Sequence, residues 1–63
     1  MGIKDLLIEQ LSEYQENYNG LEKECIHYLK EKKPFILWEE KAKKASGLKL
    51  MIEHCQAEIL RLS

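Results

Sequence analysis

The sequence has few residues that break helices and no long apolar run. Its 63 residues include one proline and three glycines, and the longest apolar run is the four-residue segment 35–38, FILW. A transmembrane helix needs about 20 mostly apolar residues, so we expect no membrane-spanning segment. The composition, with 33% charged and 44% hydrophobic residues, is typical of a helical protein in water.

The N-terminal residues lack the layout of a secretory signal peptide, which is a basic segment followed by an apolar one. The cysteines, Cys25 and Cys55, lie far apart in the sequence. Because disulfides persist mainly in oxidising compartments, two isolated thiols without an export signal favour a reduced, cytoplasmic protein. We interpret both cysteines as small apolar side chains of the core.

Patterns of catalytic, metal-binding or cofactor-binding residues are also lacking. No Gly-rich phosphate loop, Ser-His-Asp order or carboxylate pair placed for a cleft occurs, so we expect no enzymatic activity and no cofactor. Cys25, His27, His54 and Cys55 are the residue types of a zinc site. Residues two apart lie on nearly opposite sides of a helix, so a shared metal would require pairs from two copies of an antiparallel dimer. We expect no metal.

Apolar and aromatic residues in the first half recur at alternating spacings of four and three residues. This spacing keeps one stripe of side chains on the side of a helix that meets a partner helix. The stripe stays in phase across the turn dipeptide Asn19-Gly20, so we expect one helix over about residues 3–31. The stripe of this helix comprises Leu7, Leu11, Tyr14, Tyr18, Leu21, Cys25 and Tyr28.

A group of lysines followed by the single proline marks the end of this helix. Lys32 and Lys33 complement the negative end of the helix dipole, and Pro34 disfavours helical geometry at Lys33. Proline is also well placed as the first residue of a helix. We therefore predict a bend at about residues 32–33 and a second helix over about residues 34–61.

The second helix has a stripe of its own, with one irregular step near Ser46-Gly47 that leaves a kink or a break open there. Its members are Phe35, Trp38, Ala42, Ala45, Leu48, Ile52, Cys55, Ile59 and Leu62.

Two helices of similar length with a short connection fold back antiparallel. Pairing outward from the bend places Leu21 near Ala45, Tyr18 near Leu48, Tyr14 near Ile52, Leu11 near Cys55 and Leu7 near Ile59. The predicted fold is an all-α, antiparallel two-helix hairpin in one domain over residues 1–63. Because so small a domain buries only about 60% of the surface of its unfolded chain, we expect two hairpins to form a four-helix bundle as a homodimer.

Charge is divided unevenly between the two predicted helices. Residues 1–31 carry seven acidic and three basic residues, whereas residues 32–63 carry four acidic and seven basic residues. Two helices of opposite net charge suit side-by-side packing within one chain or between chains. Ion pairs between their surfaces would influence how the helices are oriented more than how stable the fold is.

Apolar residues near the bend exceed what one buried face can cover, because successive helical residues turn by about 100°. We interpret them as an interface with a second copy or with another protein; a compact monomer with bent helices is the third alternative. We call this set the bend cluster: Ile26, Leu29, Phe35, Ile36, Leu37 and Trp38. The opposite end has a smaller surplus in Leu6, Ile8, Met51 and Leu60.

Lysines around the bend raise the alternative of a nucleic-acid-associated regulator. Glu31, Glu39 and Glu40 alternate with these lysines and interrupt any uniform phosphate-binding face, so we do not expect nucleic acid as the partner. The lysines concerned are Lys30, Lys32, Lys33, Lys41, Lys43 and Lys44.

The whole chain resembles, in its size and its charged, helix-rich composition, the small early-region accessory proteins of lambda-like temperate bacteriophages. The resemblance covers the sequence from MGIKDLLIEQLSEYQENYNG through KKPFILWEEKAKKASG. The resemblance implies a non-enzymatic role in the host cytoplasm, where contacts with a host protein bias host physiology or the choice between lysis and lysogeny. It assigns no functional residues. We therefore expect a small protein-interaction module, with a nucleic-acid-associated regulator or a purely structural self-assembling subunit as alternatives.

Overall fold

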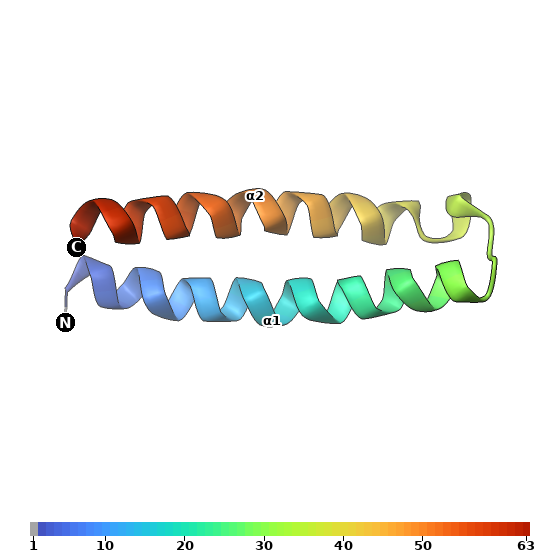
Figure 1. The fold of residues 1–63 in the computed structure, drawn as a ribbon, viewed down its shortest axis with the longest axis horizontal. Coiled ribbons are helices and arrows are strands. Elements are labelled where there is room, and N and C mark those ends of the chain that lie inside the picture. The colour runs from blue at the N-terminus through green and yellow to red at the C-terminus, as the bar shows by residue number, and fades with distance from the viewer. Residues whose placement is uncertain (1) are drawn as a thin grey trace.

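The protein is a rod of two long helices (Figure 1). The computed structural model describes residues 2–63, in which α1 spans Ile3–Lys30, the 3₁₀ helix η1 spans Phe35–Leu37 and α2 spans Glu39–Leu62. The α-helices run antiparallel side by side, and the Cα trace measures 45 × 14 × 14 Å. The predicted all-α helical hairpin is confirmed.

Both α-helices continue through their glycines. The predicted continuity of α1 across Asn19-Gly20 is confirmed, and α2 is unbroken at Ser46-Gly47. Neither Gly20 nor Gly47 has a positive φ. A mid-helix glycine costs about 1 kcal/mol relative to alanine, so each helix depends on its packing against the other to offset this cost.

The bend differs from the prediction, which placed the start of the second helix at Pro34. Lys32 adopts a left-handed conformation with φ 57°, and the N–H of Lys33 donates to the carbonyl oxygen of Tyr28 at 3.0 Å. This pattern of a left-handed residue and a backward hydrogen bond closes the C-terminus of α1. Pro34 is extended rather than helical, with ψ 141°.

The connection is longer than the predicted two residues because of its local conformation. Lys32 is left-handed and Pro34 is extended, and residues 35–37 form η1 instead of the first turn of α2. The chain therefore changes helices over all the residues between Lys30 and Glu39. The second helix begins at Glu39, five residues later than predicted.

Burial follows the face that the two helices share. Every residue of α1 that is not exposed is a member of the stripe Leu7, Leu11, Tyr14, Tyr18, Leu21, Cys25 and Tyr28. On α2 the stripe residues Ala42, Ala45, Leu48, Ile52, Cys55 and Ile59 are also at least half-buried. Among the described residues only Cys55 is fully buried, with 7% of its surface exposed, so the hairpin has a seam rather than a core.

Two members of the second predicted stripe do not lie in this seam. Phe35 is exposed because it belongs to η1, before α2 and its contacts with α1 begin. Leu62 is exposed because it is the last residue of α2, at the end of the rod. Their assignment to the stripe was therefore wrong.

Leucines two positions apart in α2 test the contribution of the seam. Leu48 lies in the seam, whereas Leu50 is 60% exposed. We expect Leu48→Ala to lower the free energy of unfolding by about 2 kcal/mol, because it removes packed apolar atoms. The matched change Leu50→Ala should alter it by less than about 0.5 kcal/mol. Urea titration followed by circular dichroism measures both, and equal effects would contradict the seam.

Candidate interaction surfaces

The bend cluster forms an apolar end of the rod. Ile36 is 75% exposed and Leu37 is 61% exposed, so the two middle residues of the run FILW face solvent. Phe35 instead packs edge-on against Trp38, with ring centroids 4.7 Å apart and an interplanar angle of 73°. Ile26 and Leu29 of α1 are also exposed. The structure thus leaves five of the six cluster residues exposed, with Trp38 half-buried.

Trp38 has an unsatisfied polar atom that sequence reasoning missed. Its indole Nε1 is buried and has no hydrogen-bond partner. An unmade hydrogen bond at a buried donor costs about 1–3 kcal/mol. Periodicity identified the ring as apolar but carried no information on its N–H, because that depends on how η1 orients the ring. The bend therefore holds its tryptophan in a position that is not optimal for the hairpin alone.

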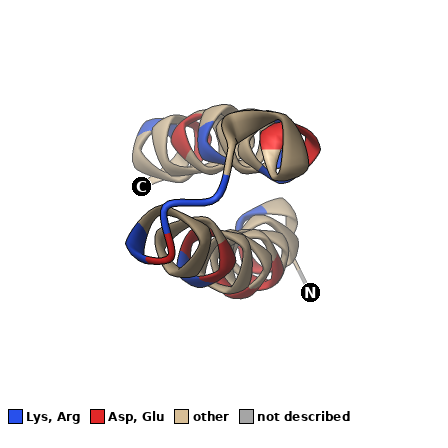
Figure 2. Cartoon of the chain, turned by 90° about the vertical axis from the view of Figure 1, so that its right-hand side faces the viewer, with Lys and Arg blue, Asp and Glu red and all other residues tan. Residues whose placement is uncertain are grey.

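Acidic partners neutralise part of the lysine group near the bend. The Lys41 ammonium donates a hydrogen bond to Glu24 Oε2 across the helix pair at 2.6 Å. Lys43 pairs with Glu39 at 3.5 Å within α2. Figure 2 shows the lysines of the bend together with acidic residues on both helices beside them. This mixture of signs is poorly suited to a uniform phosphate-binding face.

Two carboxylates alter the pKa of neighbouring groups. The hydrogen bond to Glu24, and then the charge of that carboxylate, raise the pKa of Lys41 above its ordinary value. A hydrogen bond with Glu22, followed by the charge of Glu22, raises the pKa of Tyr18. Both side chains are solvent-accessible, so these shifts mark local contacts and not a buried reactive site.

The cysteine and histidine side chains do not gather into a metal-binding cluster within the described residues. Cys25 is half-buried and Cys55 is buried, and both thiols are free. His27 pairs with Glu31 at 3.1 Å on the solvent side of α1. Within residues 2–63, no three His, Cys, Asp or Glu side chains gather closely enough to hold a metal ion. Neither α-helix in the same range is long and apolar enough to cross a membrane.

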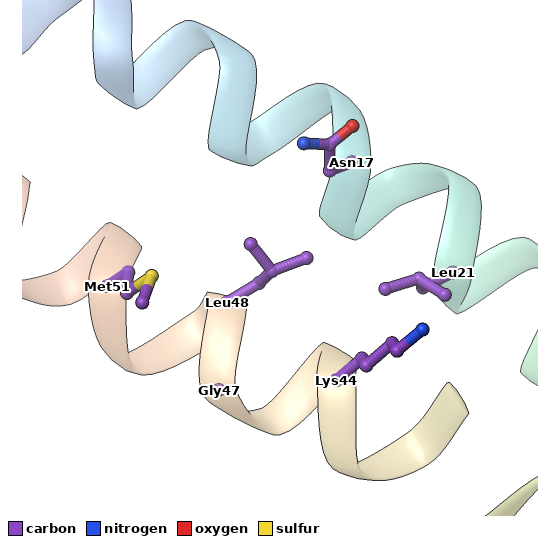
Figure 3. Close-up of a pocket in the computed structure, with 6 residues that line it drawn as sticks. All are labelled: Asn17, Leu21, Lys44, Gly47, Leu48 and Met51. Carbon is purple, nitrogen blue, oxygen red and sulfur yellow. The ribbon is translucent and has the colours of Figure 1, made fainter. Parts of the chain in front are cut away.

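A shallow apolar hollow lies along one side of the hairpin, about midway between its ends. Leu48 extends from α2 toward α1, and Leu21 extends back toward it (Figure 3). The prediction placed Leu21 near Ala45, within one helical turn of this arrangement. Sequence reasoning missed the hollow because the spacing of apolar residues marked Gly47 only as a possible break in the helix. Its lining consists of Asn17, Leu21, Lys44, Gly47, Leu48 and Met51.

The opposite side of the hairpin has a hollow of different character. Polar and charged side chains make up most of its lining, together with Tyr18 and Ile52 of the seam. The lining comprises Gln15, Tyr18, Asn19, Lys49, Ile52, Glu53 and Gln56. The two sides of the rod therefore differ in chemistry.

Comparisons with protein families, with curated proteins and with solved structures found no match to this chain.

The ion pair between the helices gives a pH-dependent test. The pKa of Lys41 is raised above its ordinary value of 10.5 in the folded state, so the pair contributes fully below that pH. The contribution is lost as the pH rises through the folded pKa, when the ammonium deprotonates. We expect the free energy of unfolding to fall more steeply above pH 10.5 in the wild type than in Lys41→Gln. Urea titrations across this range measure the difference.

Lys43→Gln is the matched control, because the pair that it removes lies within one helix. Its alkaline profile should follow that of the wild type. If Lys41→Gln and Lys43→Gln gave the same profile, the contact between Lys41 and Glu24 would make no special contribution.

Proposed function

We propose that the chain is a small, non-enzymatic protein-interaction module that self-associates into a four-helix bundle and presents its bend cluster to a protein partner. The proposal rests on one observation: the hairpin exposes more solvent-accessible surface than a compact monomer of the same mass. The hairpin exposes 5105 Å², whereas a compact monomer of its mass exposes about 4,250 Å². The excess of roughly 850 Å² matches the ~800 Å² that each partner contributes to a standard interface.

The kind of surface exposed supports the same proposal. Twelve large hydrophobic side chains are between 42% and 76% exposed, and only Cys55 is buried among the residues described. Full burial of such a side chain is worth about 1.5–3 kcal/mol. A second hairpin that covers several of them would supply the core that one hairpin lacks, as in other four-helix bundles.

The bend cluster has the composition of a partner-binding surface. Aromatic residues with adjacent exposed aliphatic residues are typical anchors of protein–protein interfaces. The unpaired Nε1 of Trp38 is a donor that a partner, or a small rearrangement on binding, can satisfy. Following the resemblance to phage early proteins, we propose a cytoplasmic host protein as the partner. This environment also keeps Cys25 and Cys55 reduced.

Solution mass tests the self-association. Sedimentation velocity across a dilution series, under reducing conditions, should show a species of twice the 7.5 kDa chain mass that dissociates as the concentration falls. A folded species of single mass at every concentration would contradict the bundle.

Substitution of the two most exposed cluster residues tests the bend. We expect Ile36→Ser with Leu37→Ser to abolish capture of a host protein while the helical content and the solution mass are retained. Leu50→Ser with Leu60→Ser is the matched control, because those leucines are 60% and 76% exposed but lie away from the bend. Capture from host lysate measures the first effect, and circular dichroism and sedimentation measure the second.

Two other outcomes of the substitution of Ile36 and Leu37 would change the proposal. Loss of the dimer would show that the bend cluster belongs to the self-association interface. Retention of both the dimer and the captured protein would contradict the proposed surface.

A further inference from the structure

We propose that the second copy docks on the side of the hairpin that carries Gly20 and Gly47, with both bends at the same end of the bundle. This inference rests on the self-association proposed above and specifies its interface. We call the docking side the glycine face; it comprises Asn17, Gly20, Leu21, Gly47, Leu48 and Met51.

The two glycines share one side and one height of the rod. Asn17 and Gly47 line the same hollow (Figure 3), and Gly20 lies beside Asn17 because residues three apart share a helical face. Leu21 and Leu48 also line that hollow, and each directly follows one of the glycines. Gly20 and Gly47 are therefore level with each other on adjacent helices.

Nothing within the hairpin explains why these positions are glycine. Both glycines are helical, neither has a positive φ, and a Cβ built at either would meet no atom within 4 Å. Alanine would fit both sites and favour the helix. A glycine that is not required by backbone conformation is typical of close approach by another backbone. Two level glycines make a notch into which a helix of a second copy fits.

The apolar lining distinguishes this side from the opposite one. Leu21, Leu48 and Met51 line the hollow next to the glycines, together with Asn17 and one charged residue, Lys44. The hollow on the other side is lined by two charged residues, Lys49 and Glu53, and by several polar ones. Because charged residues are depleted in the centre of interfaces, the glycine face is the better docking side.

Charge favours one orientation of the second copy. The flank of α1 around Gly20 carries Glu13, Glu16 and Glu24 against Lys23, an acidic surplus. The flank of α2 around Gly47 carries Lys43 and Lys44 against Glu40, a basic surplus.

Two hairpins stacked by these faces have two symmetric orientations. With the bends at the same end, α1 of each copy lies on α2 of the other, so the acidic flank meets the basic flank. With the bends at opposite ends, α1 lies on α1 and acidic residues meet acidic residues, which is unfavourable. The first orientation also places Gly20 of one copy against Gly47 of the other.

The area available is sufficient for a dimer. One face of the rod measures 45 by 14 Å, or about 630 Å² in projection. Pairing two such faces covers about 1,260 Å², which reaches the range of about 1,200–2,000 Å² for stable, specific interfaces.

Isotope-filtered NMR on the unaltered protein tests this arrangement. In a dimer assembled from ¹³C-labelled and unlabelled chains, we expect intermolecular NOEs between the Hα protons of Gly20 and Gly47, and from the Met51 methyl group to α1 of the other copy. Intermolecular NOEs from Gln15, Asn19 or Glu53 would overturn the docking side. NOEs from Gly20 to α1 of the other copy would overturn the orientation. A monomer at NMR concentrations would overturn the proposed self-association itself.

Paired substitutions provide a second test. We expect Gly20→Gln and Gly47→Gln each to raise the dimer dissociation constant about tenfold or more, because the new side chain fills the notch, while helical content is unchanged or higher. The matched controls Asn19→Gln and Ser46→Gln alter adjacent residues outside the glycine face and should change the constant less than about threefold. Sedimentation equilibrium measures it, and an unchanged constant in both glycine variants overturns the proposal.

Discussion

Two packed helices can bury only the side chains that lie between them, and the other features of this protein follow from that limit. The seam takes one residue from every three or four of each helix, which accounts for half-burial throughout and for full burial only at Cys55 among the described residues. The remaining apolar residues of both helices must lie on the outside. Their number and size make the surface, and not an internal pocket, the place to seek a function.

The same limit explains what could be predicted from sequence. Periodicity determines which residues of a long helix face a partner, so the α1 residues from Leu7 to Tyr28 that it selected are those that the structure leaves unexposed. The stripe stays in phase across Gly20, which predicted a continuous helix despite the turn tendency of Asn19-Gly20, and α1 is continuous there. The short connection correctly indicated an antiparallel hairpin.

Other features depend on local conformation that a residue pattern does not contain. The second helix begins at Glu39 and not at Pro34 because Pro34 is extended and residues 35–37 form η1, which the spacing of apolar residues does not specify. The buried Nε1 of Trp38 follows from the packing of one ring against another in η1. The sequence marked Gly47 only as a possible break in α2. The spacing of apolar residues shows where a helix is interrupted but not where its surface is hollow.

The antiparallel arrangement also separates the bend from the points where the chain enters and leaves the rod. The start of α1 and the end of α2 lie together at one end, and η1 lies at the other, along a length of 45 Å (Figure 1). A protein fused to either terminus would be held at that distance from the bend. Such a fusion would therefore leave the bend accessible to a binding protein.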